Sequence, residues 1–171
     1  LNFAKKNLGE NKIYIGYIKL RRFFNNEISN FDTNFFHTDD NCDKILKCIV
    51  YIDDILNIDD GPFVYVEGSH KQKLLNSQSS SKYSRTDKEI EEFYSSKNIK
   101  PIYGEKGTIL FANTLGYHKG VKPKNKDRYA LYVNYVCEEE YGGKGEKQKI
   151  SEKILKKFPD KSNLFEFFNV V

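Results

Sequence analysis

The chain has 171 residues, enough for one domain of ordinary size, and its formal net charge of +4 is too small and too evenly spread to indicate nucleic-acid binding. Its 12 Tyr and 13 Phe provide apolar surface for a sizeable core, which argues against a disordered chain. No apolar run approaches the roughly 18 residues that a transmembrane helix requires. We therefore predict a single globular domain over residues 1–171, with its core in about residues 12–136, and neither nucleic-acid nor membrane partners.

The cysteine content indicates the compartment. Cys42, Cys48 and Cys137 are an odd and sparse set, which argues against a disulfide framework and predicts a reducing, cytoplasmic location. The first residues lack the apolar region of a secretory signal. The sequence contains no Met, so we expect a processed product or a fragment whose upstream segment is missing.

Strand-like runs rich in β-branched and aromatic residues dominate the chain, and Gly, Pro, Asn and Asp separate them. In chain order, they cover residues 12–20, 44–55, 63–66, 107–113 and 128–136. Short strands joined by such turns predict a sandwich or barrel rather than βαβ units. In the first run, Ile13, Ile15 and Tyr17 are expected on one face of the strand.

Two segments are predicted to be helical and to pack outside the sheets. Residues 86–97 open with a capping box formed by Thr86 and Glu89, and a short amphipathic helix is expected after Ser151. Residues 71–84 are polar and typical of a loop or lid. The apolar face of the first helix is predicted to comprise Ile90, Phe93 and Tyr94.

Three residues have the chemistry of a metal site. His37 stands two residues before Asp39, and in an extended segment these side chains point to the same side. His118 follows the fourth strand-like run. Two imidazoles and one carboxylate suit ferrous iron and leave positions open for other ligands. Spacing alone leaves a second interpretation open, because such a triplet occurs by chance and a lone His is more often an ordinary surface or core residue.

Arg128 begins the last strand-like run, where a guanidinium could hold a carboxylate through two parallel hydrogen bonds. Taken alone, an exposed arginine at a strand end is the commoner case. The period of two places Ala130, Tyr132 and Asn134 on the same face as Arg128. Tyr132 and Asn134 are therefore candidate pocket residues, although Tyr132 also suits a core position.

Two long stretches resemble the phytanoyl-CoA dioxygenase-like family. They are HTDDNCDKILKCIVYIDDILNIDDGPFVYVEGSHK and GEKGTILFANTLGYHKGVKPKNKDRYALYVNYV. The resemblance covers about residues 35–136 and rests on the ordered series of HxD, DDGPFVYVEGSHK, GTxxF, HKG and Arg. The family consists of iron(II)- and 2-oxoglutarate-dependent oxygenases built on a double-stranded β-helix, or jelly roll. The resemblance therefore implies a mainly β, cupin-like fold with a few flanking helices.

The resemblance also implies roles for individual residues. His37, Asp39 and His118 would be the catalytic iron ligands, and Arg128 would bind the distal carboxylate of the cosubstrate 2-oxoglutarate. Relatives that halogenate have a small residue at the position of Asp39, so its carboxylate points to hydroxylation of a small organic substrate, with O2 consumed and succinate released. Lys47 is a candidate for holding cosubstrate or substrate, or a solvent-facing strand residue. His70 is expected to be structural or to line the site.

Two other functions stay open from the sequence: a cupin-like metal-dependent isomerase, and a non-catalytic jelly-roll binding module. The substrate is also open, and we expect residues 71–100 and the upstream segment to select it. Four lysines between His118 and Arg128 either attract an anionic substrate or form a solvated turn. They are Lys119, Lys122, Lys124 and Lys126.

Overall fold

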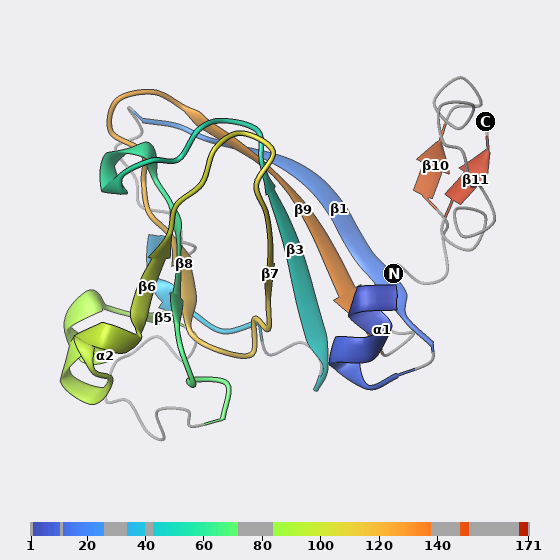
Figure 1. Cartoon of the computed structure of the whole chain (residues 1–171), viewed down its shortest axis with the longest axis horizontal. Helices are drawn as coiled ribbons and strands as arrows, with labels where there is room; N and C mark the ends of the chain where they lie inside the picture. The colour runs from blue at the N-terminus through green and yellow to red at the C-terminus, as the bar shows by residue number, and fades with distance from the viewer. Residues whose placement is uncertain are drawn as a thin grey trace.

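A computed structural model describes residues 2–10, 12–25, 34–39, 43–71, 84–137, 148–150 and 168–170. The predicted helix after Ser151, Cys42 and all but the ends of the predicted loop at 71–84 lie outside these residues. The structure is mainly β, as predicted, and two antiparallel sheets face one another in a jelly-roll arrangement (Figure 1). Within the described residues, no helix is long and apolar enough to cross a membrane.

The first sheet has four strands in the order β1-β9-β3-β7, and all its pairings are antiparallel. Its strands are β1 (Tyr14–Phe23), β3 (Ile45–Tyr51), β7 (Ile109–Ala112) and β9 (Arg128–Val136). Buried and half-buried residues alternate along the whole of β9. This alternation gives β9 an inner face that begins with Arg128, as the period of two predicts.

The second sheet has five strands in the order β5-β2-β8-β4-β6. They are β2 (Phe36–His37), β4 (Phe63–Val66), β5 (Ser84–Arg85), β6 (Ile99–Ile102) and β8 (His118–Gly120). Only β4 was predicted, because β2, β5 and β8 are too short to show a period. Pro101 interrupts β6, which is tolerated because β6 is an edge strand.

Four short helices and one further strand pair complete the described structure. The α-helices are α1 (Asn2–Leu8) and α2 (Asp87–Phe93), and the 3-10 helices are η2 (Ile58–Asp60) and η3 (Ser96–Asn98). The parallel pair is β10 (Gln148–Ile150) with β11 (Phe168–Val170).

Tyr51 connects the two sheets through the core. Its ring is fully buried at the end of β3, among Ile49 and Ala130 of its own sheet and Phe63 of the other. The hydroxyl donates a hydrogen bond to the carbonyl of Ile102 at 2.8 Å and accepts one from the backbone N–H of Phe63 at 3.1 Å. Both partners belong to the five-stranded sheet, so one buried side chain fixes how the sheets approach each other.

A β-bulge in β1 corrects one prediction. The register changes between Ile15, which pairs with Tyr135, and Tyr17, which pairs with Asn134. Because Tyr135 and Asn134 lie on opposite faces of β9, Ile15 and Tyr17 do as well. The expectation that Ile13, Ile15 and Tyr17 share one face is therefore wrong.

Helix α2 begins as predicted. The Thr86 hydroxyl accepts from the backbone N–H of Glu89 at 3.3 Å, and the Glu89 carboxylate accepts from the N–H of Thr86 at 2.7 Å. Ile90 and Tyr94 are buried, but Phe93 is 47% exposed. The helix ends at Phe93, whose ring lies at the flank of the buried face and contacts Tyr94 edge-on. Phe93 is therefore not part of the core-facing side.

Candidate metal centre

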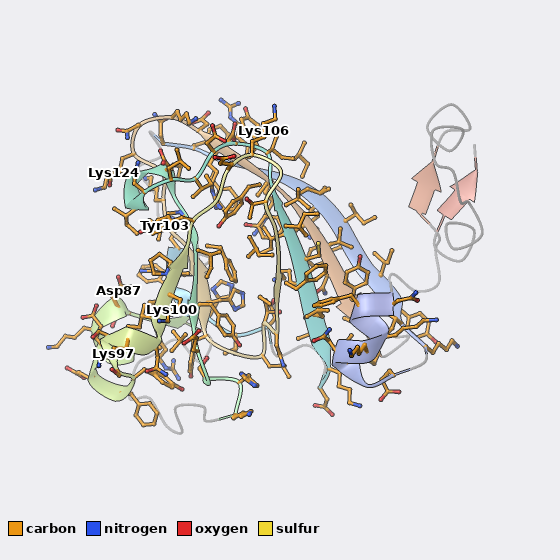
Figure 2. The ribbon with its side chains drawn as sticks, in the orientation of Figure 1. Asp87, Lys97, Lys100, Tyr103, Lys106 and Lys124 are labelled. Carbon is orange, nitrogen blue, oxygen red and sulfur yellow. The ribbon has the colours of Figure 1, made fainter. Side chains whose placement is uncertain are left out.

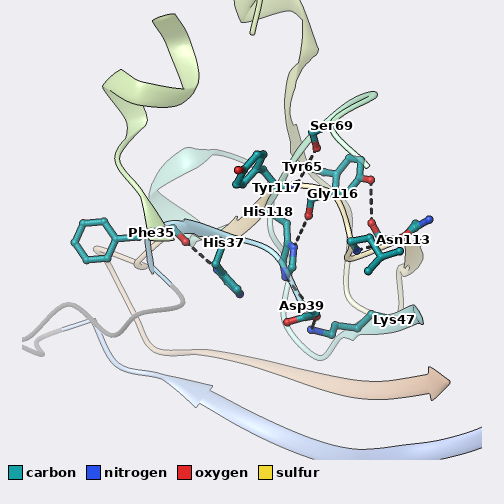
Figure 3. A network of polar contacts seen from close by, with 11 residues as sticks. Phe35, His37, Asp39, Lys47, Tyr65, Ser69, Asn113, Gly116, Tyr117 and His118 are labelled. Atoms are coloured by element: carbon teal, nitrogen blue, oxygen red, sulfur yellow. Dashed lines mark hydrogen bonds and ion pairs between the residues drawn. The ribbon is translucent and has the colours of Figure 1, made fainter. Parts of the chain in front are cut away.

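Neighbouring strands β2 and β8 bring two histidines together. His37 and His118 stand directly opposite each other in the antiparallel pair, and their ring centroids are 4.3 Å apart. Asp39 follows β2, where its backbone N–H donates to the carbonyl of Thr114 at 2.8 Å. One potential ligand atom from each of His37, Asp39 and His118 lies within 4.8 Å of the others. The structure thus brings together the three residues that the sequence predicts as ligands (Figure 3).

Backbone carbonyls orient both imidazoles. His37 Nδ1 lies 2.9 Å from the carbonyl oxygen of Phe35, and His118 Nδ1 lies 2.9 Å from that of Gly116. A carbonyl oxygen only accepts, so each Nδ1 carries the proton and each Nε2 keeps its lone pair. His118 Nε2 is buried and has no hydrogen-bond partner among the described residues. Such an imidazole is prepared to coordinate a metal through Nε2.

Burial keeps both rings uncharged. Burial, together with the neighbouring His37, lowers the pKa of His118 to about 3. Burial also lowers the pKa of His37 below its ordinary value. At neutral pH both imidazoles are therefore neutral, which is the form that binds metal ions.

Lys47 points into the interior from β3, where it stands opposite Asn134. It is buried, and its ammonium forms an ion pair with Asp39 Oδ2. Burial works to lower the pKa of Lys47, but the Asp39 carboxylate and the Tyr17 hydroxyl raise it above its ordinary value. Burial likewise works to raise the pKa of Asp39, which Lys47 and His118 hold below its ordinary value. Both partners are thus charged, and the solvent-facing alternative for Lys47 is wrong.

A hydrogen-bonded turn holds His118 in place, and Figure 3 shows its contacts. The buried Ser69 Oγ accepts from the backbone N–H of Tyr117 at 2.8 Å and donates to the carbonyl of Val66 at 2.7 Å. Tyr65 Oη lies so close to Gly116 that a Cβ there would collide with it. Ser69, within the motif DDGPFVYVEGSHK, therefore anchors the segment that carries His118, a role that the sequence did not reveal.

Arg128 is 1% exposed, and none of its three guanidinium nitrogens has a hydrogen-bond partner among the described residues. Its guanidinium carbon lies 3.8 Å from the ring centroid of Phe23. Burying an unpaired cation is costly. An anion that paired with Arg128 would remove this cost.

The inner faces of both sheets line a small cavity at the histidines. Its walls are formed by Arg21, Phe23, His37, Lys47, Phe63, His118, Gly120 and Tyr132. Tyr132 thus lines the cavity, while His70 is absent from this lining and its Nδ1 lies 3.4 Å from Tyr65 Oη. Sequence reasoning missed Arg21 and Phe23, because the predicted strand ended at residue 20.

The lysines that follow His118 are partly neutralised. Lys119 Nζ lies 2.6 and 2.7 Å from the two carboxylate oxygens of Asp87, and Lys124 Nζ lies 2.7 Å from an oxygen of Asp59. Figure 2 shows Asp87, the first residue of α2, and Lys124, which lies well away from it. Two of the four lysines therefore already have local partners and do not depend on a substrate for charge compensation.

Comparison with known proteins supports the fold. No protein-family model matches the chain, and no curated protein does. Solved structures do match. EctD from S. alaskensis with bound Fe is 17% identical with a TM-score of 0.58, and the match covers 78% of this chain and 48% of EctD. HygX from Streptomyces hygroscopicus with nickel and 2-oxoglutarate bound is 17% identical with a TM-score of 0.52, and the match covers 72% of this chain and 56% of HygX. AviO1 from Streptomyces viridochromogenes Tue57 is 13% identical with a TM-score of 0.55, and the match covers 80% of this chain and 56% of AviO1.

The chain therefore spans about half the length of these solved structures and shares their cupin-like, jelly-roll fold. The narrower resemblance to the phytanoyl-CoA dioxygenase-like family stays a prediction.

Proposed function

We propose that this chain is the catalytic domain of an iron(II)- and 2-oxoglutarate-dependent dioxygenase that hydroxylates a small organic substrate. The observation that carries the proposal is the buried Arg128 guanidinium, which has no hydrogen-bond partner among the described residues. Arg128 does not itself line the cavity at His37 and His118, but it stacks on Phe23, which does. The metal ligands alone would equally suit a cupin-like isomerase. An isomerase gives no reason to bury a free guanidinium, whereas an anionic cosubstrate does.

The three ligand residues fit a ferrous ion by their chemistry. His37 and His118 present Nε2 lone pairs, and Asp39 offers a carboxylate oxygen. Lys47 engages Oδ2, and a carboxylate can accept from a lysine with one oxygen while it coordinates a metal with the other. Two nitrogen ligands and one carboxylate on one side of an ion leave positions for cosubstrate and oxygen.

When bound, iron with 2-oxoglutarate and O2 supplies the oxidising chemistry, in which 2-oxoglutarate yields succinate and carbon dioxide and a C–H bond of the substrate becomes C–OH. The residues of the chain position and shield these groups. Arg128 would hold the distal carboxylate of 2-oxoglutarate through two parallel hydrogen bonds. Lys47 would keep Asp39 ionised and oriented. Phe23, Phe63 and Tyr132 provide apolar walls that exclude water from the cavity.

The proposal is tested by metal content, cosubstrate binding and succinate release. The chain, loaded with iron(II), is expected to bind one ion and one 2-oxoglutarate and to release succinate slowly without a substrate. His118→Ala is the matched comparison, because it removes one ligand atom from the centre. Metal binding without 2-oxoglutarate binding would favour the isomerase, and the absence of both would favour a non-catalytic binding module.

A further inference from the structure

The inner face of β1 carries two cations. Lys19 stands opposite Tyr132 and Arg21 stands opposite Ala130 in the pairing of β1 with β9. Both β9 residues are buried on the inner face, and directly opposed residues of an antiparallel pair share a face. Lys19 and Arg21 therefore lie on the side of the sheet that faces the cavity, where apolar residues are the rule.

Arg21 reaches the cavity at the histidines and has no ion-pair partner in the part of the chain that the structure describes. The ring centroid of Tyr132 lies 5.9 Å from its guanidinium carbon. Arg22, on the opposite face of the strand, is paired with Asp127 at 2.5 Å. Because Arg21 is exposed while lining the cavity, it presents free donors at the solvent side.

Arg21 has no counter-ion among the described residues, and it gains none when the site holds iron and 2-oxoglutarate. No carboxylate lines the described part of the cavity, and Asp39 behind it is already paired with Lys47. A ferrous ion and Arg128 together carry three positive charges and 2-oxoglutarate carries two negative ones, so the loaded site has no negative charge left for Arg21. The positive charge of Arg21, with that of Lys19 beside it, remains to attract a further anion.

We propose that Arg21, assisted by Lys19, binds a carboxylate or phosphate group of the primary substrate. This inference rests on the proposed function, and it places the anion site on β1 rather than on the lysines after His118. Arg21 is then a specificity-determining residue, because a neutral analogue of the substrate would leave its charge uncompensated. The competing explanation is that inward charges on β1, an edge strand, prevent edge-to-edge association.

Paramagnetic relaxation tests the location of the anion. The protein is loaded with Mn²⁺ and saturating 2-oxoglutarate without O2, and then titrated with inorganic phosphate, observed by ³¹P NMR, or with acetate, observed by ¹H NMR. An anion held at Arg21 lies near the ion and relaxes faster than in bulk solution. Arg21→Gln is expected to weaken the response about five- to tenfold, as for loss of a charge-assisted pair at a partly exposed site. Arg21→Lys should retain part of it, and Arg22→Gln, the matched control, should retain all of it.

The outcomes separate the two proposals. The protein could bind Mn²⁺ and 2-oxoglutarate without accelerating the nuclear relaxation of either anion, or Arg21→Gln could accelerate it as much as the wild type does. In either case the anion site is wrong and the proposed function stands. Aggregation of Arg21→Gln with unchanged anion affinity supports the edge-protection explanation instead. If neither Mn²⁺ nor 2-oxoglutarate binds, the proposed function fails and this inference fails with it. A lower apparent Kd for phosphate than for acetate favours a phosphorylated substrate, and the reverse favours a carboxylic acid.

Discussion

Replacing Arg128 with Met should change stability and cosubstrate binding in opposite directions. The guanidinium is 1% exposed and unpaired among the described residues, and an uncompensated buried charge costs about 3–5 kcal/mol. Stacking on Phe23 offsets about 2 kcal/mol of this cost. Met fills a similar volume without charge, so the free energy of unfolding of the ligand-free protein should rise by about 1–3 kcal/mol. Binding of 2-oxoglutarate should weaken by about 2–5 kcal/mol, which is roughly thirty-fold to several thousand-fold.

Two measurements on the same variant check this reasoning. Urea unfolding in the presence of a chelator gives the stability of the ligand-free protein, and calorimetric titration of the metal-loaded protein gives the affinity for 2-oxoglutarate. Arg22→Met is the control, because Arg22 is exposed and paired with Asp127, and it should leave cosubstrate affinity unchanged. If Arg128→Met destabilises the ligand-free protein and binds 2-oxoglutarate normally, Arg128 is a structural residue and its assignment is refuted.

Three further predictions concern the metal centre. Single replacement of His37, Asp39 or His118 by Ala should abolish stoichiometric iron binding, while circular dichroism shows an intact fold. Full metal occupancy in any of the three variants would remove that residue from the ligand set. Ser69→Ala should lower the free energy of unfolding by about 1–3 kcal/mol, because the buried backbone N–H of Tyr117 loses its acceptor. The variant should also bind the metal more weakly. An unchanged midpoint of urea unfolding would contradict the anchoring role of Ser69. Acid should destabilise the metal-free protein. The pKa of His118 is lowered from 6.5 to about 3 on folding, so between these values the unfolded chain binds a proton that the folded chain does not. Stability should therefore fall with decreasing pH below 6.5, by about 1.4 kcal/mol per pH unit for this residue, and urea unfolding of the wild type and His118→Gln should differ in that slope.

Local sequence was sufficient for the elements whose signals lie within a few neighbouring residues. The strands Phe63–Val66 and Arg128–Val136 have their predicted bounds, because their β-branched and aromatic runs end at clear turn residues. The capping box of Thr86 and Glu89 likewise requires only residues three apart. The short strands that carry His37 and His118 gave no periodic signal, and only their pairing in the sheet defines them.

For the candidate site, the sequence likewise indicated which residues take part but not the surroundings of each. The residue types of His37, Asp39, His118 and Arg128 suit metal and carboxylate chemistry, but their spacing alone left other interpretations open. The resemblance to the phytanoyl-CoA dioxygenase-like family is what selected these four residues. Tertiary structure alone decided the environment of each. It paired Lys47 with Asp39, and it buried Arg128 where no residue of the described part provides a hydrogen-bond partner for its guanidinium.

The structure also decided which cations are available to a ligand. Asp87 neutralises Lys119 from a helix distant in the sequence, whereas pairing with Ala130 of β9 places Arg21 on the face toward the cavity, where no carboxylate of the described chain meets it. The physical reason is that a charge is compensated, and a strand face is buried, by residues far apart along the chain. The sequence by itself determined which chemical groups are present, and the packing of the two sheets decided which of them remain unpaired at the cavity.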